Sequence, residues 1–190
     1  MRARPNIRRL TRLGICASLA LIMYIIESAV PVPVPIPGIK LGLSNLVILF
    51  LLIRYKPLDG VIVLGLKVLL GALLAGQAVS LIYSLCGGLL CFGIMWLLSI
   101  LLQKRLIPVI SMFGALFHNL GQILAARVLT GSPEIWYYLP YLVLSAIVTG
   151  LLTGCICLIL CRKLYLPMFE PSDCDSDEDK PEDRNTEGDK

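Results

Sequence analysis

The sequence predicts an all-α, polytopic membrane protein with six transmembrane helices, on the strength of its composition, its apolar segments and its pattern of basic residues. Of its 190 residues, 57% are hydrophobic and 16% are charged, and the mean hydropathy is +0.82. A typical soluble domain is about 45–50% apolar and about 25% charged, so a soluble chain of this size could not cover its apolar surface. The composition therefore argues against a soluble enzyme, a nucleic-acid-binding protein and a disordered regulator.

Six apolar segments supply the predicted helices. Most of them approach the roughly 20 residues that span about 30 Å of hydrocarbon. The second segment is shorter, because its 15 residues rise only about 22 Å along a helix. We therefore expect its preceding loop to dip into the membrane, or other protein to shield its end. The six segments cover residues 13–26, 41–55, 58–76, 79–102, 108–129 and 137–161.

The first segment follows five arginines and has the length of the apolar region of a secretory signal. We expect it to be a retained helix instead. Cleavage near residues 28–30 would leave a proline-rich stub and an odd number of apolar segments.

Basic residues predict the orientation and the division of the chain. Residues 1–169 hold 14 basic and 3 acidic side chains, whereas residues 170–190 hold 3 basic and 10 acidic ones. If the N-terminus is cytoplasmic, eleven basic residues fall at cytoplasmic positions and only Lys40 falls in an outer loop. We therefore predict a cytoplasmic basic N-terminus (1–12), a six-helix transmembrane domain (13–166) and a disordered acidic cytoplasmic tail (167–190).

The residues that commonly bind metals are not arranged for it. The chain has seven cysteines and one histidine, without the closely spaced set of four ligands that zinc prefers. The acidic tail lacks the rigid frame that a magnesium site for diphosphate chemistry needs. We predict no metal, no cofactor and no catalytic residue, and we expect the cysteines to be small apolar side chains within helices.

The loop before the second segment carries the strongest polar feature. Four alternating prolines make it stiff, and Gly38 marks a turn after the last of them. A helix then begins near Gly42, Ser44 and Asn45, where free backbone N–H groups favour an anion. With Lys40 beside them, these residues predict an anion site at the outer face. The alternative is a stiff connector with an ordinary helix cap.

A charged side chain lies inside the third segment. Lys67, Gly71 and Ala75 follow a four-residue spacing and share one helical face. Small residues on that face let helices approach closely, so the lysine is expected to point inward. It then needs an acceptor, either Glu27 or an anionic ligand. The alternatives are a purely structural pair with Glu27, or a lysine that extends to the interface.

The fifth segment carries a stripe of small and polar residues. His118 and Gln122 lie on this stripe and Asn119 lies beside it, so these side chains face protein rather than lipid. Each can donate and accept hydrogen bonds to a buried ligand. The alternative is hydrogen bonding between helices, which stabilises many membrane bundles.

These motifs resemble those of a bacterial family known as heptaprenyl diphosphate synthase component I, or the Gx transporter family. The resemblance covers residues 27–154 and rests on PGIKLGLSN, GLKVLLGALLAG, SLCGGLL, HNLGQ and TGLLTG. It implies a relative of the S components of energy-coupling factor (ECF) transporters. Those proteins have six helices, bind a small solute near the outer face, and work with a coupling subunit and paired ATPases.

The resemblance also implies where a partner binds. S components contact the coupling subunit through small residues on the first helix, and here only Gly14 and Ser18 approximate that pattern. The family name implies a second function, as a membrane accessory to a soluble prenyl diphosphate synthase subunit. A prenyl diphosphate synthase holds magnesium with clustered acidic residues. Residues 1–169 contain only the scattered acids Glu27, Asp59 and Glu134, so the chain cannot catalyse prenyl diphosphate synthesis by itself.

We therefore expect the substrate-binding component of a small-solute uptake transporter in the bacterial cytoplasmic membrane, without catalysis of its own. The alternative is a membrane accessory component of heptaprenyl diphosphate synthesis. The solute can be anionic, because two lysines suit a carboxylate, a phosphate or a diphosphate equally. The expected binding residues are Glu27, Gly38, Lys40, Gly42, Ser44, Asn45, Lys67, His118, Asn119 and Gln122.

Overall fold

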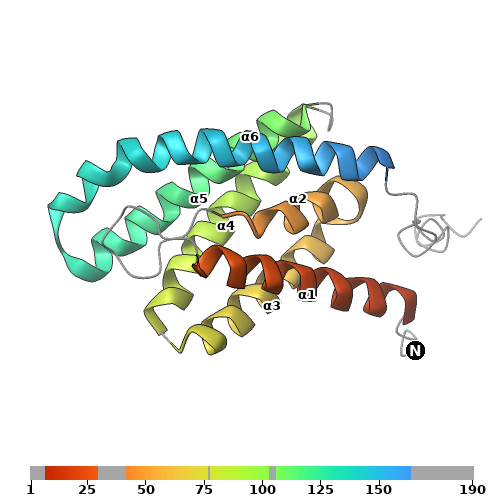
Figure 1. Cartoon of the computed structure of the whole chain (residues 1–190), viewed down its shortest axis with the longest axis horizontal. Helices are drawn as coiled ribbons and strands as arrows, with labels where there is room; N and C mark the ends of the chain where they lie inside the picture. The colour runs from red at the N-terminus through yellow and green to blue at the C-terminus, as the bar shows by residue number, and fades with distance from the viewer. Residues whose placement is uncertain (1–6, 30–41, 77, 103–105, 164–190) are drawn as a thin grey trace, which may run out of the picture.

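The computed structural model describes residues 7–29, 42–76, 78–102 and 106–163, and within these ranges all regular structure is helical (Figure 1). The prediction of an all-α membrane bundle is confirmed. In chain order the elements are α1 (Ile7–Ala29), α2 (Asn45–Arg54), α3 (Pro57–Ala75), α4 (Ala78–Leu101), α5 (Ile107–Thr130), the 3-10 helix η1 (Pro133–Tyr138) and α6 (Leu139–Lys163).

The bundle has the surface of a membrane protein. In the described part of the chain, five helices (α1, α3, α4, α5 and α6) are long and apolar enough to cross a membrane. Large apolar side chains point outward along them, which would be costly in water. Among the exposed examples are Leu19, Leu73, Leu97, Ile100, Val148 and Leu152.

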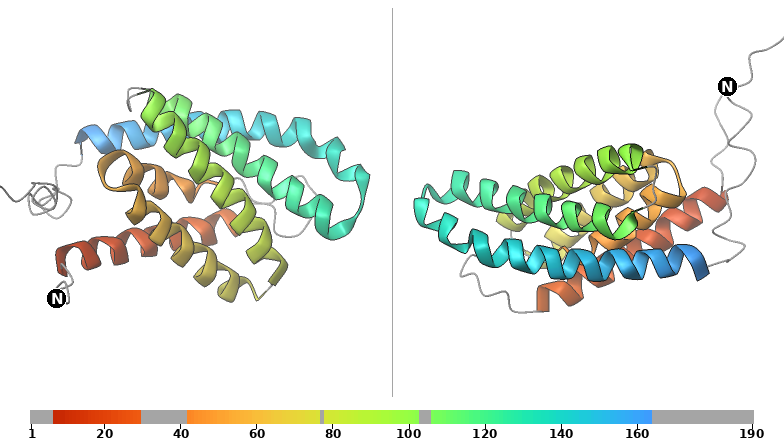
Figure 2. Two further views of the ribbon diagram at one scale, coloured as in Figure 1. Left: turned by 180° about the vertical axis from the view of Figure 1, so that it is seen from behind. Right: turned by 90° about the horizontal axis from the view of Figure 1, so that it is seen from above.

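Helix α2 is the exception, with 10 residues. Its first eight residues, Asn45 to Leu52, are all buried. The helix lies in the middle of the bundle and contacts each of the other five α-helices (Figure 2). Protein therefore shields its short span from lipid, which is one of the two arrangements that its length predicts.

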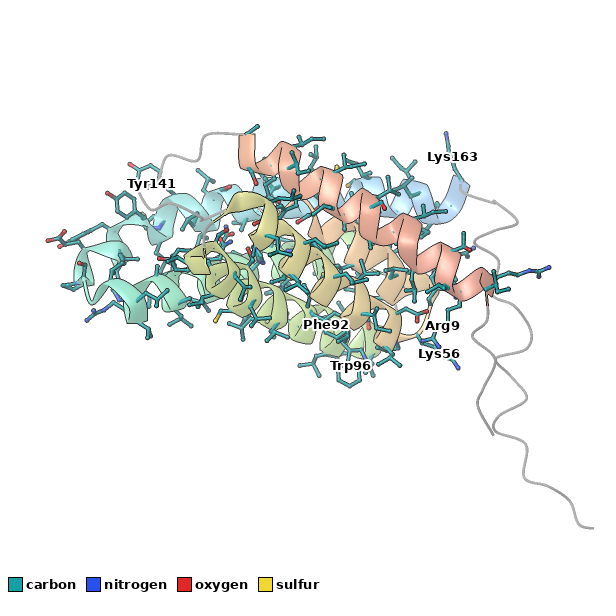
Figure 3. The ribbon with its side chains drawn as sticks, turned by 90° about the horizontal axis from the view of Figure 1, so that it is seen from below. Arg9, Lys56, Phe92, Trp96, Tyr141 and Lys163 are labelled. Atoms are coloured by element: carbon teal, nitrogen blue, oxygen red, sulfur yellow. The ribbon has the colours of Figure 1, made fainter. Side chains whose placement is uncertain are left out.

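The first helix is longer than its apolar segment, since it begins at Ile7 rather than at residue 13. Basic residues from three parts of the chain then gather at one end of the bundle. Figure 3 shows Arg9, Lys56 and Lys163 toward this end and Tyr141 toward the opposite one. The helices alternate in direction as the sequence predicts. That the basic end faces the cytoplasm stays a prediction.

An ion cluster joins α1 to the start of α3 at this basic end. Arg9 donates to Asp59 Oδ1 through Nε (2.9 Å) and Nη2 (2.7 Å), and Arg12 lies 3.8 Å from Asp59 Oδ2. The guanidinium of Arg12 also stacks 4.0 Å from the ring centre of Tyr55. Both Arg12 and Asp59 are buried. A buried charge without its counter-charge is costly, so the cluster holds α1 in place.

Replacing Asp59 with asparagine is expected to lower the stability of the bundle by about 1–3 kcal/mol, because Arg12 loses its counter-charge while remaining buried. The measurement is the apparent melting temperature of the purified protein in detergent. Glu134→Gln is the matched control, since Glu134 is exposed at the opposite end. Equal melting temperatures for the two variants would mean that the cluster does not stabilise α1.

Glycines set the spacing of the later helices. A β-carbon at Gly154 of α6 would lie 2.5 Å from Cα of Pro108 in α5, and one at Gly150 would lie 2.6 Å from Cα of Met112. On α5, a β-carbon at Gly121 would lie 2.8 Å from the carbonyl oxygen of Cys86 in α4. These helices therefore pack backbone against backbone, as small residues allow in membranes.

Candidate functional site

The carboxylate of Glu27 caps a neighbouring helix. Glu27 lies at the end of α1 and is 1% exposed. Its Oε1 accepts the backbone N–H of Gly42, and its Oε2 lies 3.4 Å from both the backbone N and the hydroxyl of Ser44. Ser44 makes no capping bond with its own side chain. The anion position predicted at the start of α2 is thus occupied by an acid of the same chain.

Lys67 contacts the same turn from α3. It is 2% exposed, and its Nζ donates to Ser44 Oγ (3.0 Å) and to Asn45 Oδ1 (2.8 Å). The predicted pairing of Glu27 with Lys67 is therefore made through Ser44, whose hydroxyl contacts both side chains. The structure thus joins the side chains of four predicted residues, and the backbone of a fifth, Gly42, in one hydrogen-bonded network.

Helix α5 closes the site from the other side. His118 and Gln122 line a cavity with Glu27, Ser44 and Lys67. Nδ1 of His118 lies beside the backbone of Gly87 but makes no hydrogen bond of good geometry among the described residues. This cavity has room for about one water molecule. A solute can therefore enter only if the surrounding segments move apart.

Asn119 turns away from this cavity. Its Nδ2 donates to the carbonyl oxygen of Leu142 in α6 over 2.9 Å. This contact is the hydrogen bond between helices that was the alternative for the polar stripe. Asn119 is not one of the residues that line the cavity.

Three lining or supporting residues were not predicted. Tyr24 and Ser84 line the cavity, and Ser80 lies 3.3 Å from the hydroxyl of Tyr24. A signal for them exists in the sequence. Tyr24 precedes Glu27 by three residues on the same face of α1, and Ser80 and Ser84 are four residues apart on α4.

A second cavity lies on the far side of the Gly42–Asn45 turn. Asn45 lines this cavity and also contacts Lys67 of the first one. Its Oδ1 must point toward Lys67, which can only donate, so its Nδ2 is turned away. This Nδ2 is buried without a hydrogen-bond partner among the described residues. The second cavity also has room for about one water. Its lining is Gly42, Asn45, Leu46, Cys91, Met95, Ser111, Ala115 and Thr153.

The remaining predicted residues lie away from the network. Gly71 packs against the ring of Tyr24 on α1. Gly14 and Ser18 are on an exposed face of α1, where a β-carbon at Gly14 would meet nothing within 4 Å. Gly38, Lys40 and the side chain of Ala75 lie outside the described residues.

Gly42 combines a positive φ with close packing against the site. Its φ is +85°, and a β-carbon there would lie 3.0 Å from His118 Cδ2 and 3.1 Å from Asn45 Nδ2. We expect Gly42→Ala to cost about 1–2 kcal/mol in backbone strain and to displace His118 from the cavity lining, which lowers the melting temperature of the purified protein further. Gly76→Ala is the control, because Gly76 also has positive φ (+64°) in open space. Equal melting temperatures for the two variants would mean that the contact of Gly42 with His118 adds nothing to the backbone strain.

Candidate metal ligands are also separated in space. Among residues 7–29, 42–76, 78–102 and 106–163, no group of three or more histidine, cysteine and acidic side chains could hold a metal ion. The six cysteines in these ranges are free thiols.

An apolar exterior around a buried network of charged side chains defines an all-α integral membrane protein. A family model described as heptaprenyl diphosphate synthase component I matches residues 16–160. The chain belongs to this family, which confirms the resemblance seen in its motifs. Comparisons with curated proteins and with solved structures give no significant match.

Proposed function

We propose that the protein is the membrane-embedded binding component of an uptake transporter for a small polar solute. The observation that carries the proposal is the buried network of Glu27, Ser44, Asn45 and Lys67 beside a cavity. Ionisable groups within a membrane bundle are costly and usually serve a function. Three helices bring these groups to one point, which is what recognition of a solute requires.

The position of the network supports uptake. It lies where α1 ends and α2 begins, far from the end where Arg9 and Lys163 gather (Figure 3). If that basic end is cytoplasmic, as its charge predicts, the network lies toward the outside of a bacterial cytoplasmic membrane. Both chain termini are then cytoplasmic, and the solute reaches the cavity from outside.

Transport would need partners that supply energy. We propose a membrane coupling subunit with ATPases, in the manner of ECF transporters. The exposed face of α1 that carries Gly14 and Ser18 is the surface we assign to that contact, because small residues there allow another helix to approach closely.

The second candidate function is a membrane accessory of heptaprenyl diphosphate synthesis. The description of the family favours it. In this case the partner would be a soluble prenyl diphosphate synthase subunit, and the chain would present a lipid substrate to it. Purification from native membranes separates the two functions. Co-purifying ATPases support transport, and a co-purifying prenyl synthase supports the accessory role.

The direct test is mass spectrometry of small molecules retained by the purified protein. We expect a retained solute in the unmodified protein and its loss in Lys67→Met. Lys56→Met is the matched control, because Lys56 is exposed at the basic end and should leave retention unchanged. Equal retention by both variants would mean that Lys67 does not bind the solute. If the unmodified protein retains no solute, the result counts against solute binding.

A further inference from the structure

The cavity beside Ser44 is lined by one acid and one base. Glu27 and Lys67 carry opposite charges, and the other lining residues are neutral at pH 7 with the histidine counted as uncharged. The described lining therefore has no net charge. The neutral members are Tyr24, Ser44, Ser84, His118 and Gln122.

A solute with a net charge would disturb this balance. Moving an unbalanced charge from water into a protein interior of low dielectric constant is costly, whereas a paired charge costs much less. An anion at Lys67 would also approach the carboxylate of Glu27, and a cation at Glu27 would approach the ammonium of Lys67. A solute that carries both charges avoids each of these penalties.

The present contacts are ones that such a solute can replace. Two acceptors of Lys67 are neutral oxygens, those of Ser44 and Asn45, and Glu27 accepts from neutral groups of Gly42 and Ser44. A hydrogen bond between two charged groups is stronger than one with a neutral partner. A carboxylate at Lys67 and an ammonium at Glu27 would therefore improve on what each side chain has now.

We propose that the solute is a short zwitterion, such as an α-amino acid or a close analogue. Its acid group contacts Lys67 and its ammonium group contacts Glu27. This rests on the proposed function and narrows its substrate class. The two charges of the solute should be close together, since a single hydroxyl, that of Ser44, reaches both Lys67 Nζ (3.0 Å) and Glu27 Oε2 (3.4 Å). A short spacer between the two groups, as in an α-amino acid, suits this arrangement.

The test compares matched probes on the full chain in lipid nanodiscs. Each set contains an amino acid, the same molecule without its amine, and the same molecule without its carboxylate. Examples are leucine, 4-methylpentanoate and 3-methylbutylamine, and phenylalanine, 3-phenylpropionate and 2-phenylethylamine. For the set that binds, we expect the amino acid to bind at least about tenfold more tightly than either of the other two molecules. This is the loss expected when one charged hydrogen bond is removed.

Two variants assign each charge to its partner. Glu27→Gln should remove the preference for the amino acid over the acid without an amine. Lys67→Met should remove the preference for the amino acid over the amine that has no carboxylate. Gel filtration and the apparent melting temperature establish that each variant is folded, and the two variants are independent tests. Unchanged preferences in a folded variant would overturn the assignment.

The identity of the retained solute separates this inference from the proposed function. A retained zwitterion supports both. A retained anion or cation supports solute binding and overturns the zwitterion inference. If no solute is retained and no probe set binds, both fall.

Discussion

Replacing Lys67 with methionine is expected to destabilise the bundle by about 3–5 kcal/mol, because the carboxylate of Glu27 remains buried after its counter-charge is lost. The side chain is 2% exposed and donates to Ser44 and Asn45, so its removal also takes a hydrogen-bond donor from both of these residues. The apparent melting temperature and the yield of monodisperse protein in detergent measure this loss.

A double-mutant cycle tests whether the cost comes from the charge. Glu27→Gln combined with Lys67→Met removes both charges, and we expect the double variant to recover much of the stability lost in Lys67→Met alone. Solute retention should stay lost in the double variant. Additive losses of stability would mean that Glu27 and Lys67 act separately, and would contradict the role of Ser44 as the group that joins them.

Replacing Gly154 with alanine is expected to lower stability by an amount near the upper end of the roughly 1–3 kcal/mol typical of overpacking. The new β-carbon would lie 2.5 Å from Cα of Pro108, and backbone atoms cannot move aside as the end of a side chain can. Helices α5 and α6 would have to separate. The melting temperature of the purified variant measures the effect.

Gly65→Ala is the control for this prediction. A β-carbon at Gly65 of α3 would meet nothing within 4 Å, so the substitution should be neutral or slightly stabilising, by about 0.5–1 kcal/mol, because alanine favours the helix. The two glycine substitutions therefore have opposite expected signs. Similar melting temperatures would mean that α5 and α6 tolerate a wider spacing.

Most of the fold could be predicted from the sequence, because the apolar segments between basic residues have the length of membrane helices. The full length of α1 could not be predicted. The helix includes Arg9 and Arg12, whose counter-charge, Asp59, comes from a distant part of the chain. The enclosure of α2 was one of two arrangements consistent with its length, and only the contacts with the other helices decide between them.

The candidate site could be predicted in part. Glu27 and Lys67 stand out because charged residues are rare in membrane helices. The sequence does not reveal that Glu27 caps α2, since this depends on how α1 and α2 meet across the connecting loop. Ser44 is among the predicted binding residues, but the sequence does not reveal that its hydroxyl contacts both charged side chains. Tyr24 and Ser84 were not predicted because neither side chain is charged, and an uncharged polar residue in a membrane helix is a weaker signal of a site than a charged one.

The central position of α2 has a consequence for biosynthesis. The helix contacts α6, which leaves the ribosome after the other five α-helices that the structure describes. Until α6 arrives, one side of a segment too short for the hydrocarbon layer has no protein neighbour, and lipid must thin around it. Insertion of α6 is therefore the step that completes the enclosure of α2, and a chain that stops after α5 should be degraded faster than the complete one.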